Sequence, residues 1–273
     1  MAIEGQLKSI ERDAASMESV RQDATKQITD QNRRLENAVA EAARTMFGTD
    51  REFENSLKQQ QQAGAQQIQF SRGGKSFDLS QVDPKQVIRQ RELTGAEEAR
   101  LKNIEEVLDQ ILVTSKGIVG AINKELYLAE QFKKLTEQSL AALSKDIRDL
   151  QKQAAAGDTT ALSTAEKATR EMNQLQQRLA PMTAAIEGLK AARQDAIKVM
   201  VTSQTGIKLL RNVHDRTDLE DILLAASAGF GITAAVAALI GAASAAGILA
   251  LPALIAFTAS RLVLLFKRVT EAE

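Results

Sequence analysis

The sequence contains no cysteine, no tryptophan and only one histidine among its 273 residues. Without cysteine the chain can form no disulfide, no zinc-thiolate site and no thiol nucleophile. Apart from His214, the candidate catalytic or metal-binding side chains are scattered carboxylates. Their spacing in the sequence is not typical of a catalytic or metal site. We therefore expect that the chain is not an enzyme and uses no cofactor, no metal and no small-molecule substrate.

An excess of charge of one sign is also missing, because 35 Lys and Arg residues balance 35 Asp and Glu residues. Nucleic-acid-binding chains usually carry a basic surplus that neutralises phosphates, so no nucleic acid partner is expected. Aromatic residues make up only 3% of the chain, while Ala, Leu, Gln, Glu, Lys and Arg dominate. This composition predicts an all-α fold, namely an elongated antiparallel helical bundle or coiled coil with a small β-hairpin insertion and a C-terminal hydrophobic helical hairpin.

Residues 1–47 are predicted to form one long helix. Apolar residues recur every seven positions on two lines, the first made of Ile3, Ile10, Met17, Ala24 and Ala38, and the second of Leu7, Ala14, Ile28, Leu35 and Ala42. Arg21 and Gln31 interrupt the pattern. Because the stripe is narrow and rich in alanine, the helix needs a partner helix to cover it.

Residues 48–93 differ in character, beginning with a glutamine-rich stretch. Residues 68–79 alternate apolar and polar side chains around Gly73 and Gly74, which predicts a β-hairpin. The neighbouring Arg72 and Lys75 lack the spacing and the following helix of a phosphate-binding loop, so a hairpin turn is the preferred interpretation. Asp83 and Pro84 then predict the start of a short helix that reaches residue 91.

Residues 94–216 are predicted to form a long antiparallel helical pair. Thr94 and Glu97 have the spacing of a capping box, and a stripe of apolar residues follows at helical spacing, with a shift near Leu126. The first helix, of about sixty residues, ends at Gly157. Either Asp158 or the residue after it caps the second helix.

The second helix of this pair has a heptad pattern that continues to residue 210. Pro181 lies in the middle of the pattern and predicts a kink or a local break. Because the turn between the two helices is short, we expect the helices to pack antiparallel.

Residues 217–268 contain an uncharged run from Ile222 to Ser260. A single membrane-spanning helix needs about 20 apolar residues, so this run is too long for one helix and suits two closely turned ones. We predict a membrane-inserting hairpin, followed by a polar tail at residues 269–273. Its inserting side chains are expected to be Leu223, Leu224, Phe230, Ile232, Val236, Leu239, Ile240, Ile248, Leu249, Leu251, Leu254, Ile255 and Phe257.

The turn of this hairpin is expected between Gly241 and Gly247, where small residues gather. Pro252 either kinks the second arm or begins it, and both alternatives stay open. Basic residues flank the two arms, and we expect them at the membrane interface: Lys208, Arg211, Arg261, Lys267 and Arg268. The positive-inside tendency then places both flanks in the cytoplasm for an integral protein. The expected localisation is membrane-associated, either integral with cytoplasmic termini or soluble before insertion, and no cleavable signal peptide is expected.

Two features of this segment have alternative interpretations. The apolar hairpin is either a core element of the helical bundle or a membrane element; neither arm carries the polar stripe that a core helix usually keeps toward solvent. A hairpin that the bundle buries at first and later releases into a membrane is consistent with both interpretations. The start of the hairpin segment carries a histidine and four acidic residues, namely His214, Asp215, Asp218, Glu220 and Asp221. This cluster is either an exposed, capped helix start or a pH-sensitive group whose protonation eases the approach to a bilayer.

Long helices joined to an Ala- and Gly-rich hairpin at residues 219–266 resemble the architecture of helical pore-forming toxins, namely the pore-forming colicins and the cytolysin A family. The layout is also similar to that of type III secretion translocators. The resemblance implies a membrane-inserting, pore-forming or membrane-permeabilising function. Its expected partners are the lipid bilayer and further copies of the chain or related helical subunits, since small residues favour close helix contacts in lipid. The alternative function is a constitutively membrane-anchored coiled-coil scaffold, or a signalling or defence effector.

Overall fold

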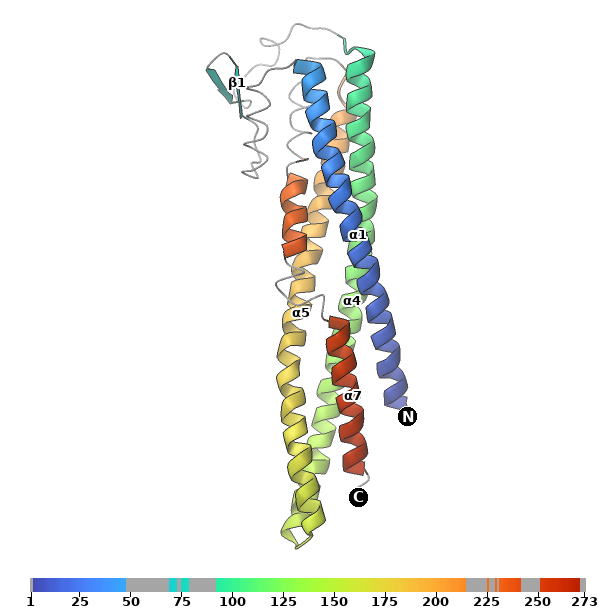
Figure 1. Ribbon diagram of the computed structural model, residues 1–273, viewed down its shortest axis with the longest axis vertical. Coiled ribbons are helices and arrows are strands. Elements are labelled where there is room, and N and C mark those ends of the chain that lie inside the picture. Colours follow the sequence, from blue (N-terminus) through green and yellow to red (C-terminus); the bar gives the residue numbers. More distant parts are fainter. Residues whose placement is uncertain are drawn as a thin grey trace. The chain divides into compact units, whose positions relative to one another are not determined.

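The computed structural model describes residues 2–47, 69–72, 75–78, 92–214, 225, 229, 231–241 and 251–270 (Figure 1). Its long helices are α1 (Ala2–Phe47), α4 (Gly95–Ala155) and α5 (Thr159–Arg211), and a shorter helix α7 (Leu251–Thr270) follows. Residues 231–241 are also helical. Strands β1 (Gln69–Arg72) and β2 (Lys75–Asp78) pair antiparallel, with Phe70 opposite Phe77. The fold is therefore all-α in its main elements, as the composition predicts.

Some predicted elements lie outside the described residues. They are the glutamine-rich stretch and the short helix expected after Pro84. The chain forms two compact units. Unit 1 contains residues 1–21, 121–192 and 241–273, and unit 2 contains residues 22–120 and 193–240. Each unit combines segments from distant parts of the sequence, because long antiparallel helices bring these segments together.

Helix α1 buries one of the two lines of its heptad pattern. Leu7, Ala14, Ile28, Leu35 and Ala42 are all almost fully buried. Arg21 occupies the same line and is also buried, with 3% of its surface exposed. Its Nε donates a 2.8 Å hydrogen bond to Glu125 Oε2 on α4 within unit 1. The interruption in the predicted stripe is therefore a buried ion pair rather than a loss of helix contact.

Helix α4 begins at the predicted capping box. The backbone N–H of Thr94 donates to Glu97 Oε2 at 2.8 Å, and the N–H of Glu97 donates to Thr94 Oγ1 at 3.3 Å. These two bonds satisfy donors that a helix start leaves without intrahelical partners. The sequence-based prediction of this helix start is confirmed.

The predicted shift of the α4 stripe near Leu126 is wrong. The buried stripe continues at regular helical spacing through Ile122, Glu125, Ala129, Phe132 and Thr136. The pattern is difficult to recognise because polar residues interrupt it. The Thr136 hydroxyl donates to the Phe132 carbonyl at 2.9 Å. Glu125 accepts from Arg21 through Oε2, while its buried Oε1 has no hydrogen-bond partner among the described residues.

A tight turn joins α4 to α5. Gly157 has a φ of 109°, in the left-handed region that side chains disfavour. The Asp158 carboxylate then accepts hydrogen bonds from the N–H groups of Thr160 and Ala161, at 2.8 and 3.0 Å. Of the two candidate caps, Asp158 is therefore the residue that caps α5.

Helix α5 continues through Pro181, so the predicted local break at this residue is wrong. Proline removes the backbone hydrogen bond to Gln177, four residues earlier. Both Pro181 and Gln177 are exposed, so water can hydrate the free carbonyl group. Leu175 and Met182 are buried on either side of the proline and hold the helix in place.

The hydrophobic core of unit 1 includes side chains from α4, α5 and α7. Figure 1 shows α7 running alongside α4 and α5 in this unit. The core residues are Leu140, Leu143, Ile147 and Leu150 from α4, Ala161, Ala165, Ala168 and Leu175 from α5, and Leu262, Leu265 and Val269 from α7.

Candidate functional site

Helix α7 contains the second arm of the predicted hairpin and presents one apolar face to the core. The buried residues recur every three or four positions and are Leu251, Ile255, Ala259, Leu262, Leu265 and Val269. Pro252 lies in the first turn, where backbone N–H groups have no intrahelical acceptor. Both alternatives for Pro252 stay open, because residues 242–250 lie outside the described part of the chain.

Helical residues 231–241 carry part of the first arm, and all of them except Gly241 belong to unit 2. Ile232, Val236 and Leu239 are buried on one face. A Cβ atom built at Gly231 would lie 3.5 Å from Thr202 of α5. Thr233 donates through its hydroxyl to Asn32 of α1 at 3.3 Å. This part of the arm is therefore in contact with α1 and α5.

The outer faces of the two arms differ from each other. Among the described residues of the first arm, the exposed ones are all small or apolar, namely Ala234, Ala237, Ala238, Ile240 and Gly241. On α7 the exposed face includes Arg261 and Lys267. The exposed face of α7 is therefore mixed, because Phe257 and Leu264 are exposed beside these charged residues.

Not every predicted inserting residue is buried. Leu251 and Ile255 are fully buried and Leu254 is half-buried, whereas Ile240 and Phe257 each expose 41% of their surface. Other predicted site residues lie outside the described part of the chain, namely Leu223, Leu224, Phe230, Gly247, Ile248 and Leu249, and the acidic residues Asp215, Asp218, Glu220 and Asp221. His214 is described and exposed. Among the described residues, no helix combines the length and the apolar content that crossing a membrane requires.

Two of the basic residues expected at a membrane interface pair with carboxylates of neighbouring helices. Arg211 donates from Nε to Glu105 at 2.6 Å and lies 3.8 Å from Asp109, both on α4. The hydrogen bond to Glu105 is the main cause that raises the pKa of Arg211. Arg268 of α7 forms an ion pair with Glu171 of α5. Lys208, Arg261 and Lys267 are exposed.

An aromatic ring between two arginines lies on the outer face of unit 1. The guanidinium carbon of Arg178, on α5, is 4.8 Å from the centre of the Phe257 ring, and that of Arg261 is 5.4 Å from it. Both distances are within the range of cation–π contacts. Sequence reasoning selected Phe257 and Arg261 but missed Arg178, which comes from a different helix and lies in no recognisable motif.

Helix α7 also buries a hydroxyl group that is poorly accommodated. Thr258 is fully buried, and its Oγ1 has no hydrogen-bond partner among the described residues. An unsatisfied buried polar group costs about 1 to 3 kcal/mol. The packing of α7 against its neighbours is therefore weaker than its apolar face alone would provide.

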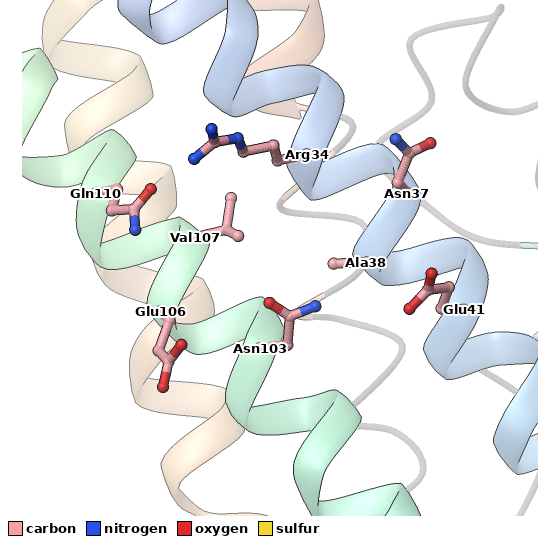
Figure 2. Close-up of a pocket in the computed structure, with 8 residues that line it drawn as sticks. All are labelled: Arg34, Asn37, Ala38, Glu41, Asn103, Glu106, Val107 and Gln110. Atoms are coloured by element: carbon pink, nitrogen blue, oxygen red, sulfur yellow. The ribbon is translucent and has the colours of Figure 1, made fainter.

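A separate polar groove lies between α1 and α4 in unit 2 (Figure 2). In Figure 2 the Arg34 side chain extends from α1 toward α4, and Val107 extends from α4 into the space between the two helices. The remaining lining residues are Asn37, Ala38, Glu41, Asn103, Glu106 and Gln110. Within the described part of the chain, no group of three or more His, Cys, Asp or Glu side chains is placed to hold a metal ion.

Comparison with known proteins gives no relative for this chain: no family model, no curated protein sequence and no solved structure matches it.

Proposed function

We propose that this chain is a membrane-inserting helical protein of the pore-forming or membrane-permeabilising kind. In this proposal the helical bundle covers the apolar C-terminal segment, residues 217–268, in water. The segment then leaves the bundle and enters the bilayer, and several copies assemble there. The resemblance in layout to helical pore-forming toxins points in the same direction. The main support is the apolar face of α7, which is buried against α4 and α5.

The size of this apolar face explains why the segment would leave the bundle only for another apolar medium. Five large aliphatic side chains of α7 are almost fully buried, namely Leu251, Ile255, Leu262, Leu265 and Val269. Each contributes about 1.5 to 3 kcal/mol when it is removed from water. Release of α7 into water would forfeit this free energy, whereas hydrocarbon is as apolar as a leucine-rich core and would largely preserve it.

Two polar features limit how firmly α7 is held. The buried Thr258 hydroxyl lowers the stability of the packed state. The ion pair between Arg268 and Glu171 is partly exposed, with 39% and 25% of the side chains accessible. Exposed ion pairs contribute about 0 to 1 kcal/mol because water screens them. The helix is thus held mainly by nonpolar contacts, which a bilayer can replace.

A reversible cross-link between α7 and α5 would test this proposal. The chain has no native cysteine, so cysteines at positions 171 and 268 (Glu171→Cys and Arg268→Cys) can be joined by a cleavable bis-maleimide. We expect the cross-linked protein to cause no leakage from dye-loaded liposomes. Leakage should return when the linker is cleaved, because α7 is then free to leave.

The matched control joins α4 to α5 instead. Lys190 Nζ lies 3.7 Å from Glu130 Oε1 in the same unit, and neither residue belongs to α7. Cross-linking Glu130→Cys to Lys190→Cys should leave leakage unchanged. Leakage from the chain locked at positions 171 and 268 would contradict the proposal. A chain that requires detergent to stay in solution from the moment of synthesis, and that never causes dye leakage from liposomes, would instead favour the anchored coiled-coil scaffold.

A further inference from the structure

We propose that Arg178, Phe257, Arg261 and Leu264 form a docking surface for the phosphate-bearing headgroups of an anionic lipid bilayer. This inference rests on the proposed function, since it describes how the chain first meets the membrane that it enters. The four residues belong to unit 1 and come from two helices, α5 and α7.

The geometry brings two cations onto one aromatic ring. Arg178 and Arg261 lie 4.8 and 5.4 Å from the centre of the Phe257 ring. Neither guanidinium forms an ion pair with a carboxylate among the residues that the structure describes. Two like charges on one ring repel each other, and an anion between or above them relieves this repulsion.

The stretches of α5 and α7 that carry this surface provide no unpaired carboxylate to act as that anion. Helix α7 contains no Asp or Glu from Leu251 to Thr270, and α5 contains none between Glu171 and Glu187. Glu171 is itself paired with Arg268, and Glu187 is paired with Lys190. The charge of this face is therefore positive and open to an anionic partner from solution.

Apolar side chains on the same face favour a bilayer over a soluble anion. Phe257, Arg261 and Leu264 are spaced at i, i+4 and i+7, so they share one side of α7. Phe257 is 41% exposed and Leu264 is 52% exposed. Basic residues interleaved with exposed apolar residues are typical of helices that lie in the membrane interface, where guanidinium groups contact phosphates and apolar groups reach the acyl boundary.

Flotation with vesicles of two compositions tests the surface. One vesicle is pure phosphatidylcholine, and the other contains equal amounts of phosphatidylcholine and phosphatidylglycerol. Each basic residue near an anionic bilayer strengthens binding about fivefold. The double variant Arg178→Gln/Arg261→Gln should therefore bind the anionic vesicles about 25-fold more weakly than the unmodified chain. Its thermal unfolding should remain close to that of the unmodified chain.

The matched control removes two positive charges elsewhere in the same unit. Lys134→Gln/Lys167→Gln alters exposed lysines of α4 and α5 and should bind anionic vesicles almost as the unmodified chain does. Phe257→Ala should weaken binding without any change in charge. Equal loss in both double variants would overturn the docking surface, because binding would then follow net charge alone. Displacement from the vesicles by soluble glycerol phosphate at matched ionic strength would also overturn it.

Failure of this inference and failure of the proposed function give different results. If the docking surface is wrong, Arg178→Gln/Arg261→Gln binds and permeabilises anionic vesicles as well as Lys134→Gln/Lys167→Gln does. If the proposed function is wrong, the unmodified chain binds anionic vesicles through this face but releases no dye.

Discussion

Arg21 and Glu125 form an ion pair in the interior of unit 1, with an Nε to Oε2 distance of 2.8 Å and side-chain exposures of 4% and 0%. Both residues occupy positions on apolar stripes, Arg21 on α1 and Glu125 on α4. Two charges placed in such an interior lose their hydration, and each depends on the other for compensation. The pair therefore fixes which residues of α1 and α4 lie opposite each other.

Removal of one partner of this pair should be costly. We expect Arg21→Met to lower the free energy of unfolding by about 3 to 5 kcal/mol, because it leaves the Glu125 carboxylate buried without its counter-ion. The double variant Arg21→Met/Glu125→Met should recover most of this loss. Chemical denaturation followed by circular dichroism measures both values. If Arg21→Met lowers the free energy of unfolding by no more than the double variant does, the two side chains have no energetic coupling.

The same pair predicts a pH dependence. Burial raises the pKa of Glu125 above its ordinary value of 4.5, and this effect outweighs the opposing hydrogen bond and charge of Arg21, while Glu18 raises the pKa slightly further. The folded chain then holds this proton more tightly than the unfolded chain. The contribution of this group to stability is fully present below the unfolded pKa and is lost as pH rises through the folded pKa.

Glu125→Gln removes this titration and provides the measurement. The free energy of unfolding of the unmodified chain minus that of Glu125→Gln should fall as pH increases above 4.5. Glu106→Gln, which alters an exposed carboxyl of the same helix, is the control. A difference that increases with pH would mean that Arg21 lowers the pKa of Glu125 more than burial raises it.

Thr258→Val should stabilise the packed state of α7. Valine has nearly the shape of threonine and removes a buried hydroxyl that lacks a partner, so we expect a gain of about 1 kcal/mol. Thr136 is a matched control because it is equally buried but donates a 2.9 Å hydrogen bond to the Phe132 carbonyl. Thr136→Val should lose about 0.5 to 1.5 kcal/mol. If the proposed function holds, liposome leakage should also be slower for Thr258→Val, and an unchanged unfolding midpoint would contradict the stability argument.

Ala234→Asp separates the packed state from membrane insertion. Ala234 is exposed in the structure, so the substitution should change the free energy of unfolding by no more than about 0.7 kcal/mol. A charge near the centre of an inserted helix costs about 2.5 to 3.5 kcal/mol, which corresponds to about 100-fold weaker insertion. Ala184→Asp, at an exposed position of α5, controls for the added charge. Equal leakage from both variants would exclude the first arm from the bilayer.

The long helices could be predicted from the sequence because their signals are local. The capping box at Thr94 and Glu97, the left-handed Gly157 and the Asp158 cap all act within a few residues of one another. Arg21 was recognisable only as an interruption of a pattern. A carboxyl on the α4 stripe, Glu125, is the complementary signal, but recognising the pair requires knowing which turns of two distant helices lie opposite each other.

The candidate site was harder to predict for the same reason. The apolar residues of the two arms stand out by composition, and their spacing indicates which face of each helix is buried. The partners on other helices, such as Arg178 beside Phe257 and Glu171 beside Arg268, depend on tertiary packing. Composition alone also cannot distinguish a face that is apolar toward a protein core from one that is apolar toward lipid, because both environments exclude water.

Glycine substitutions test the turn between α4 and α5. Gly157→Ala should destabilise the chain by about 1 kcal/mol or more, because φ is 109° and a Cβ atom is strained in this region. Gly117 and Gly120 are the matched controls, since both are in the interior of α4 with open space where a Cβ would lie. Alanine at either position should stabilise the chain by about 0.5 to 1 kcal/mol, because glycine loses more conformational freedom when a helix forms. Thermal unfolding distinguishes the two cases by sign, and a stabilising Gly157→Ala would mean that the turn does not require a left-handed residue.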